Sequence, residues 1–228
     1  YESRFAQTSK LRAVRRLEGC HLVHACREAG AAEVKAITRC FQRSELERGL
    51  LKVAPKLAAA MQHAVFPGGA RIRPQLTLAV ARACGEDDAQ LTDGAACAIE
   101  LLHCASLVHD DLPCFDAAET RRGRPSVHRA FGERLAVLAG DALIVAAFEV
   151  LGRTTRRHLS RLPVLLRTVS QGVGMPLGIV AGQAWECEPQ LSLADYQQAK
   201  TGALFAAATM AGAQAAGADG EPWRALGE

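Results

Sequence analysis

The segment from His103 to Asp116 constrains the fold more than any other part of the chain. It continues an apolar, helix-forming stretch and ends with three carboxylates within seven residues. A helix advances about 100° per residue, so His103, Ser106 and Asp110 are predicted to share one face. The pattern therefore predicts a core helix that delivers polar groups to a site at its carboxyl end.

The three carboxylates belong to Asp110, Asp111 and Asp116. Acidic groups this close repel one another unless a cation neutralises them, and oxygen ligands suit Mg²⁺, which also binds substrate phosphates. On an unbroken helix Asp110 and Asp116 would diverge by about 120°. Pro113 lacks an N–H and its ring clashes with the carbonyl of His109, so the helix should end there and the turn should bring Asp116 back. The sequence predicts a magnesium site; an exposed acidic helix end is the alternative.

The rest of the chain also favours helices. Aromatic residues make up only 5% of the chain, Ala and Leu are abundant, and no alternating strand pattern or long repeat occurs. The predicted fold class is all-α, a helical bundle. Its helices are expected at residues 44–66, 74–84, 93–110, 133–151, 162–170, 176–185 and 193–216.

Local signals set the expected ends and faces of these helices. Ser44 and Glu47 match a capping box, and Pro55 is a candidate kink in the helix that follows. Asp93 is expected to cap the helix that leads to the acidic segment. The helix at 133–151 is expected to turn one apolar face inward, made of Leu135, Leu138, Ala142 and Val145.

The first 43 residues differ from the rest in charge. Residues 1–50 hold ten Lys and Arg against six Asp and Glu, whereas the whole chain has a net charge of +3. We expect residues 1–43 to be a basic N-terminal extension of unknown role and residues 44–228 to form the main domain. The small overall charge gives no case for nucleic-acid binding.

Apolar runs and cysteine spacing bear on the cellular setting. The longest apolar runs, such as 142–148, are too short to span a bilayer, so no transmembrane segment is predicted. The eight cysteines include no Cys-x-x-Cys pair and lie mostly in apolar helical contexts. A reducing, cytoplasmic location is therefore expected.

Two arginine-rich elements indicate anion binding. Arg121 and Arg122 follow the acidic segment, and guanidinium donors fit phosphate oxygens in a forked geometry. The second element is Gly68-Gly69-Ala70-Arg71-Ile72-Arg73-Pro74, in which glycines let the backbone approach a ligand and the next helix N-terminus favours anions. Together with the acidic segment they predict a metal-bridged diphosphate and a second diphosphate pocket. Alone, a pair of arginines is more often a solvated surface feature, and Gly-Gly before a proline is equally typical of an ordinary turn.

These motifs occur in the order seen in trans-isoprenyl diphosphate synthases (the polyprenyl synthetase family), which the chain resembles. Residues 106–114 and 137–143 look most like bacterial and plastid members that make geranylgeranyl diphosphate. Residues 178–202 are most similar to members from carotenoid and bacteriochlorophyll pathways of purple bacteria. The resemblance covers roughly residues 44–228 and rests on Gly-Gly-x-Arg-x-Arg-Pro, His103 with Asp-Asp-x-x-x-x-Asp, Arg121-Arg122-Gly123, Gly182-Gln183 and Lys200-Thr201-Gly202.

The resemblance implies an isoprenoid-synthase helical bundle around a central cavity, usually as a homodimer. It also implies a Mg²⁺-dependent reaction between isopentenyl diphosphate and an allylic diphosphate: dimethylallyl, geranyl or farnesyl diphosphate. The allylic diphosphate group departs, the double bond of isopentenyl diphosphate attacks the resulting cation, and a proton is lost. The implied final product is geranylgeranyl diphosphate.

The resemblance assigns site residues by motif position. The metal ligands would be Asp110, Asp116 and Glu186, the last standing where the family usually has Asp. One basic set would bind isopentenyl diphosphate, and a second polar set would face the allylic diphosphate, its metals and the forming cation. The first set is Arg71, Arg73, His103 and Arg122, and the second is Arg121, Lys200, Thr201 and Gln183, with Asp111 in support.

Two departures from the family pattern carry expectations of their own. Ala70 stands where the family often has Lys, so Arg71 or Arg73 would carry more of the contact to isopentenyl diphosphate. The family's second aspartate-rich motif would follow shortly after Trp223, and the remaining residues do not supply it. With the missing initiator Met, this suggests a fragment of a longer chain, from which the C-terminal helices are absent. Residues 1–228 alone are therefore expected to turn over poorly or not at all.

Product length is expected to depend on Ala105 and Ser106, about one turn before the first aspartate of the motif. In the family, a bulky aromatic residue at this level stops growth at fifteen carbons, so small side chains indicate a twenty-carbon product. Close helix packing is the other reading of small residues here.

Four alternative functions stay open. They are a farnesyl diphosphate synthase, a non-catalytic regulatory subunit, a purely structural protein and a terpene cyclase. Arg73, His103 and Arg122 argue against the terpene cyclase.

Overall fold

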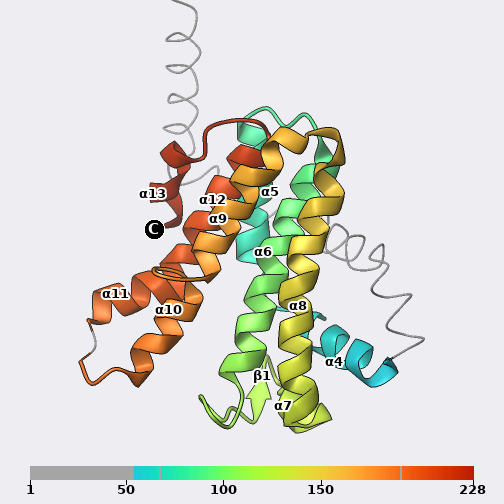
Figure 1. The fold of residues 1–228 in the computed structure, drawn as a ribbon, viewed down its shortest axis with the longest axis vertical. Coiled ribbons are helices and arrows are strands. Elements are labelled where there is room, and N and C mark those ends of the chain that lie inside the picture. The colour runs from blue at the N-terminus through green and yellow to red at the C-terminus, as the bar shows by residue number, and fades with distance from the viewer. Residues whose placement is uncertain (1–53, 67, 191) are drawn as a thin grey trace, which may run out of the picture.

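The structure, a computed structural model, describes residues 54–228 except 67 and 191. The extension expected at residues 1–43 and the capping box at Ser44 and Glu47 lie outside the described residues. Nearly all of the regular secondary structure in the described part is helical, which confirms the all-α prediction (Figure 1).

The helices follow one another along the chain with short connections (Figure 1). The first half holds α4 (Pro55–Val65), α5 (Ile72–Ala83), α6 (Ala89–Asp110), α7 (Val127–Phe131) and α8 (Glu133–Thr154). The second half holds α9 (Leu162–Val173), α10 (Ile179–Ala184), α11 (Leu193–Gln197), α12 (Ala203–Ala215) and α13 (Arg224–Gly227). A small antiparallel hairpin, β1 (Thr120–Arg121) with β2 (Arg124–Pro125), precedes α7. A π-helical segment, Gln198–Gly202, joins α11 to α12, and 3₁₀ turns lie at Thr155–Arg157, Leu159–Arg161, Trp185–Cys187 and Glu221–Trp223.

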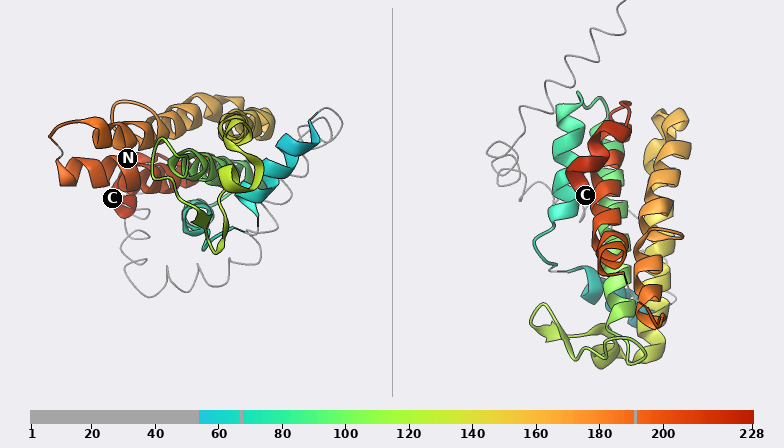
Figure 2. Two further views of the ribbon diagram at one scale, coloured as in Figure 1. Left: turned by 90° about the horizontal axis from the view of Figure 1, so that it is seen from below. Right: turned by 90° about the vertical axis from the view of Figure 1, so that its left-hand side faces the viewer.

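Helix α6 lies at the centre of the bundle. It packs against α5, α8, α12, α4 and α9. Figure 2 shows three layers, with α5 on one side, α6 and α12 in the middle, and α8 and α9 on the other side. Ile99, Leu101 and Leu102 of α6 are almost completely shielded from solvent. Because α6 is surrounded by other helices, its central position fixes where its ends emerge.

The start of α6 differs from the prediction. Asp93 was expected to cap the helix, but Asp88 does so: its Oδ1 accepts the backbone N–H groups of Gln90 (3.0 Å) and Leu91 (3.3 Å). Asp88 has an extended backbone, the conformation of an N-cap residue, and the helix therefore starts one turn earlier than predicted. Likewise, Pro55 opens the first turn of α4, where the missing N–H costs nothing, and does not kink α4.

Helix α8 turns a different face to the core from the one predicted. Leu138 and Val145 are 52% and 65% exposed, and Leu135 and Ala142 are half-buried. Small side chains let the backbones of α6 and α8 come close together, so the larger apolar side chains are left on the outside. The buried face consists mostly of small residues: Ala136, Ala139, Gly140, Leu143, Ala146, Ala147, Val150 and Leu151.

Two hollows lie between the helices of the described part. A groove of about 700 Å³ opens between α9, the π-helical segment, α12 and α13, lined mainly by small and apolar residues such as Gly172, Met175, Ala203 and Met210. A smaller pocket lies between α4, the end of α6 and the hairpin. The second hollow adjoins the acidic segment.

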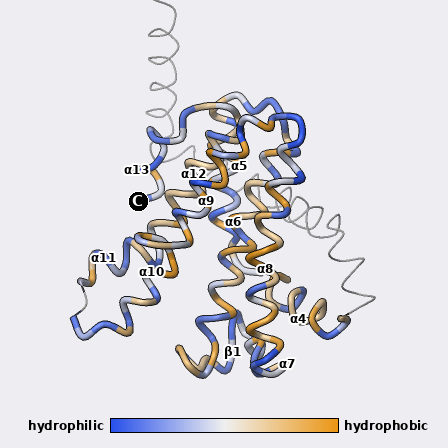
Figure 3. The backbone as a smooth tube through the Cα atoms, in the orientation of Figure 1, coloured by the Kyte–Doolittle hydropathy of each residue, from blue (hydrophilic) through white to orange (hydrophobic). Residues whose placement is uncertain are grey.

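Within the part of the chain that the structure describes, two helical stretches meet the length and composition of a membrane span, α6 and Glu133–Arg157. Their apolar character is visible along both helices in Figure 3. The apolar window of α6 is 78% buried inside the protein and that of Glu133–Arg157 is 44% buried. Core helices pass the same test, so neither stretch clearly indicates a membrane span.

Candidate functional site

The carboxyl end of α6 turns back on itself, as the sequence predicts. The helix ends at Asp110, and Asp111 is its C-cap. The backbone N–H of Asp116 donates a hydrogen bond to the carbonyl oxygen of Asp110 (3.0 Å). The turn through Pro113 thereby brings together two carboxylates that an unbroken helix would hold apart.

Asp110 and Asp116 form an acidic group with Glu186 from the 3₁₀ turn Trp185–Cys187. Carboxylate oxygens of the three residues lie within 4.8 Å of one another. Asp110 is buried and the other two are exposed. Burial and the charge of Asp110 raise the pKa of Asp116. Three converging carboxylates are a donor set that fits a hard divalent cation such as Mg²⁺.

Two further predicted residues contact the acidic group. The Lys200 ammonium lies 2.6 Å from Glu186 Oε1 and 3.3 Å from Asp110 Oδ1, and Gln183 Nε2 donates to Asp110 Oδ1 (3.2 Å). Burial alone would lower the pKa of Lys200, but its contacts with Glu186, Tyr196 and Asp110 outweigh burial and raise it. The ammonium therefore stays charged.

Close backbone packing brings these side chains together. A Cβ atom on Gly182 of α10 would lie 2.4 Å from the backbone nitrogen of Lys200, so this approach requires glycine. Gln183 follows Gly182 directly and Glu186 lies four residues after Gly182, which puts both beside Lys200. Thr201 is exposed in the same π-helical segment, an irregularity of the kind often found at functional sites.

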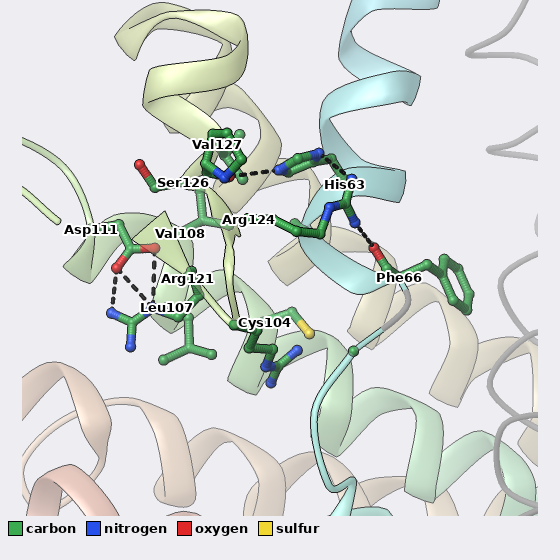
Figure 4. A pocket seen from close by; sticks show the side chains of 14 residues that line it. His63, Phe66, Cys104, Leu107, Val108, Asp111, Arg121, Arg124, Ser126 and Val127 are labelled. Carbon is green, nitrogen blue, oxygen red and sulfur yellow. Dashed lines mark hydrogen bonds and ion pairs between the residues drawn. The ribbon is translucent and has the colours of Figure 1, made fainter. Parts of the chain in front are cut away.

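Asp111 does not join the acidic group. Its carboxylate is buried and accepts hydrogen bonds from Arg121, whose Nε lies 2.9 Å from Oδ1 and 3.2 Å from Oδ2, while Nη2 bonds Oδ1 as well (Figure 4). These bonds raise the pKa of Arg121 despite its partial burial. Asp111 thus orients the Arg121 guanidinium.

A basic cluster, consisting of Arg73, His103 and Arg122, forms where the start of α5 meets α6. Arg73 Nη1 lies 3.4 Å from His103 Nε2, and the Arg73 guanidinium lies 4.1 Å from the ring centre of Phe205. Burial, followed by the charges of Arg73 and Arg122, lowers the pKa of His103 to about 3. Burial is also the largest cause that lowers the pKa of Arg73, and the charge of Arg122 adds to it. Positive groups that disfavour one another's charge make a site for an anion.

Arg122 reaches this cluster across Gly69. A Cβ atom on Gly69 would lie 2.8 Å from Arg122 Nε, so a side chain there would displace the guanidinium. Arg122 itself has a positive φ of 55°, which is uncommon for a residue with a side chain. The hairpin turn therefore holds the backbone of Arg122 in an energetically unfavourable conformation, and this directs its side chain toward Gly69.

Arg71 is placed differently from the other predicted ligands. Its side chain is 4% exposed; Nη1 donates to Glu100 Oε1 (2.7 Å), and Nη2 donates to the carbonyl oxygen of Val65. A diphosphate would reach Arg71 only by breaking this ion pair. Glu100 was not recognised from the sequence, although a lone carboxylate inside the apolar run 95–102 was a signal that a buried cation would face it.

The two residues expected to control product length lie one turn before Asp110. Ala105 is 1% exposed and packs in the hydrophobic core. Ser106 is half-buried, and its hydroxyl donates to the carbonyl oxygen of His103 (2.8 Å). The structure therefore puts Ala105 against the core and leaves Ser106 partly open.

Arg124 is a further residue that sequence reasoning missed. It lines the pocket in Figure 4 with the Asp111–Arg121 pair; Nη1 donates to the carbonyl oxygen of Phe66 (2.6 Å) and Nη2 lies 2.7 Å from His63 Nδ1. Arg124 thus fastens the hairpin to α4. Its signal in the sequence was a third arginine directly after Arg121-Arg122-Gly123.

Comparison with known proteins gives a consistent picture. The sequence model of one family, polyprenyl synthetase, matches residues 54–228. The chain is 58% identical over 183 residues to a geranylgeranyl diphosphate synthase from Cereibacter sphaeroides, covering 80% of this chain and 64% of that protein. It is 57% identical over 173 residues to the Rhodobacter capsulatus protein of the same name, covering 76% and 60%. It thus spans less than two thirds of the length of either relative.

Solved structures agree with the fold. An FPP/GFPP synthase from Zymomonas mobilis has a TM-score of 0.77 and 30% sequence identity, and the match covers 91% of this chain and 76% of that chain. A geranyltranstransferase from Thermotoga maritima has a TM-score of 0.71 and 29% identity, covering 89% and 72%.

Removing one partner of the buried Arg71–Glu100 pair should destabilise the protein strongly. We expect Glu100→Ala to lower the free energy of unfolding by about 3–5 kcal/mol, because it leaves the Arg71 charge buried without its carboxylate. The double variant Arg71→Met/Glu100→Leu should recover most of this loss. Urea denaturation measures both, with the exposed Glu149→Gln as the control. A loss below about 1 kcal/mol for Glu100→Ala would contradict the role given to the pair.

Proposed function

The chain belongs to the polyprenyl synthetase family, and on that premise we propose that the protein is a magnesium-dependent prenyltransferase. It condenses isopentenyl diphosphate with allylic diphosphates to give geranylgeranyl diphosphate, for isoprenoid and carotenoid biosynthesis. The observation that carries the proposal is the convergence of Asp110, Asp116 and Glu186 beside Lys200 at one end of α6. The names of the two relatives support the choice of product.

The acidic group is the part of the site suited to the metal. Asp110, Asp116 and Glu186 would hold magnesium through oxygen ligands, which hard cations prefer. When bound, magnesium supplies positive charge that stabilises the departing diphosphate group.

Two cations of the chain flank the acidic group and can bind the allylic diphosphate. Asp111 orients Arg121, and Lys200 stays charged because its anionic neighbours raise its pKa. Negative charge grows on the diphosphate as its bond to the allylic carbon breaks, so donors already in place stabilise the transition state more than the bound substrate.

The basic cluster suits isopentenyl diphosphate. Arg73 and Arg122 supply positive charge, while the low pKa of His103 keeps its ring neutral. Because Arg73 Nη1 is a donor, His103 Nε2 is the acceptor in that pair and Nδ1 carries the ring hydrogen. The diphosphate is thus anchored away from the acidic group, which leaves the double bond of isopentenyl diphosphate to attack the allylic cation before a proton is lost.

A homodimer is part of the same proposal. Val137, Leu138 and Val145 of α8 are 42%, 52% and 65% exposed. Leu138 and Val145 are seven residues apart and point in nearly the same direction, so they form an apolar stripe on the outside of the bundle. Such a stripe is typical of a protein–protein interface. Light scattering on the purified protein tests it, because Val145→Glu should convert a dimer into a monomer, and an unchanged mass would contradict the assignment.

The reaction is tested directly with the purified full-length protein, because residues 1–228 alone are expected to turn over poorly: it is incubated with Mg²⁺, labelled isopentenyl diphosphate and each allylic diphosphate, and the products are separated by chromatography. We expect geranylgeranyl diphosphate, loss of turnover on chelation and recovery with Mg²⁺. Asp110→Asn and Asp116→Asn should each lower kcat by about 10²–10³-fold, because each removes an anionic metal ligand. The exposed Asp219→Asn is the matched control and should leave kcat unchanged.

Other outcomes of this experiment would each overturn part of the proposal. Farnesyl diphosphate as the end product would assign a farnesyl diphosphate synthase. Binding of isopentenyl diphosphate without turnover, in a protein that purifies with a catalytic partner, would assign a regulatory subunit. Full turnover by both aspartate variants would show that the acidic group has no role in the reaction.

Product length should respond to side-chain size one turn before Asp110. We expect Ala105→Tyr to raise the share of farnesyl diphosphate, because a ring at this level blocks the growing chain. Since Ala105 packs in the core, Ser106→Tyr at the half-buried neighbour is the second variant. If both variants fold, by circular dichroism, and still make only the twenty-carbon product, this part of α6 does not limit chain growth.

A further inference from the structure

Tyr196 contacts the acidic group through Glu186. It lies in α11, four residues before Lys200, so the two side chains are neighbours across one helical turn. The Tyr196 hydroxyl donates a hydrogen bond to Glu186 Oε1 (2.6 Å), the same oxygen that the Lys200 ammonium bonds (2.6 Å). The Lys200 ammonium also lies 5.5 Å from the centre of the Tyr196 ring. The sequence analysis did not single out Tyr196.

Glu186 is the member of the acidic group that most needs support. It lies in a three-residue 3₁₀ turn at the surface, and its side chain is 31% exposed. A glutamate carboxylate also has one more rotatable bond than an aspartate carboxylate, so it loses more conformational freedom when it is held in one place. A fixed neighbour that restricts the glutamate before a cation binds would reduce that loss.

Lys200 alone is poorly suited to this task. Its ammonium is shared between Glu186 and Asp110, which lies 3.3 Å away, and its positive charge competes with a cation for both carboxylates. The Tyr196 hydroxyl is neutral and donates to Glu186 at Oε1, so it can hold the carboxylate without competing for a cation through its own charge. Hydrogen bonds to metal-binding carboxylates commonly orient them in this way.

We propose that Tyr196 is a positioning residue that holds the Glu186 carboxylate in place for a divalent cation shared with Asp110 and Asp116. The inference rests on the metal site of the proposed function, but it concerns the affinity of that site and does not depend on the product formed. It also explains how glutamate, longer by one methylene than the aspartate usual in the family, serves in this position.

The test is the substitution Tyr196→Phe, which removes the hydroxyl and keeps the ring beside Lys200. Mn²⁺, a paramagnetic cation with similar oxygen ligands, is titrated into the purified protein with and without inorganic diphosphate, and the free ion is followed by electron paramagnetic resonance. We expect the Kd for Mn²⁺ to rise about tenfold in the variant. The Mg²⁺ concentration for half-maximal turnover should rise by the same factor, with an unchanged KM for isopentenyl diphosphate.

Two controls separate positioning from a general effect on α11. Asp195→Asn changes the charge of the neighbouring exposed residue and should leave the Kd for Mn²⁺ unchanged. In a Glu186→Gln background, Tyr196→Phe should have no additional effect on this Kd, because the carboxylate it holds is gone. A Tyr196→Phe effect that persists in that background, or an unchanged Kd in the single variant, would overturn the proposal.

The outcomes also separate this proposal from the proposed function. Weaker Mn²⁺ binding by Tyr196→Phe in a protein that makes no prenyl product would support the positioning role and contradict the prenyltransferase. Normal prenyl transfer with an unchanged Kd for Mn²⁺ in Tyr196→Phe would support the prenyltransferase and contradict the positioning role. A protein that binds no Mn²⁺ at all, even with diphosphate, would contradict both.

Discussion

A helix buried on every side must pair each charge that it carries, and this constraint organises the whole site. Helix α6 carries Glu100, Asp110 and Asp111 in or at the end of its apolar length. Each charge draws a cation from a different element: Glu100 from the loop before α5, Asp111 from the hairpin, and Asp110 from the π-helical segment before α12. Pairing the charges of the core helix is therefore what gathers distant parts of the chain around it.

The same pairing divides the site into a negative and a positive part. The acidic group lies at the end of α6, where carboxylates outnumber the one ammonium that bridges two of them. The basic cluster lies further back along the helix, where burial and mutual repulsion keep His103 neutral. A metal-bound diphosphate and a metal-free diphosphate would be sorted between these two parts by charge alone.

The sequence predicted the features that depend on local chemistry. The fold class followed from helix-forming composition, and the turn that returns Asp116 to Asp110 followed from the geometry of Pro113.

Features that depend on which of several similar residues is used were harder to predict from the sequence. Asp88 and Asp93 are both suitable cap residues, so the residue types alone do not decide between them. Apolar residues occur on every side of α8, so periodicity could not show that the small residues would face α6 and the large ones solvent. Arg71 has the same chemistry as Arg73, and only the buried Glu100 distinguishes them.

Because His103 and Asp110 lie on one continuous helix, α6 fixes the distance and the angle between the two halves of the site. Seven residues make nearly two full turns and a rise of roughly 10 Å. Loop changes elsewhere cannot alter that separation, whereas inserting a single residue between the two would rotate one half by about 100° relative to the other. The distance between the two halves can therefore change only by insertions or deletions of whole helical turns if both are to stay on the same face of α6. This separation is among the features of the protein least open to gradual variation.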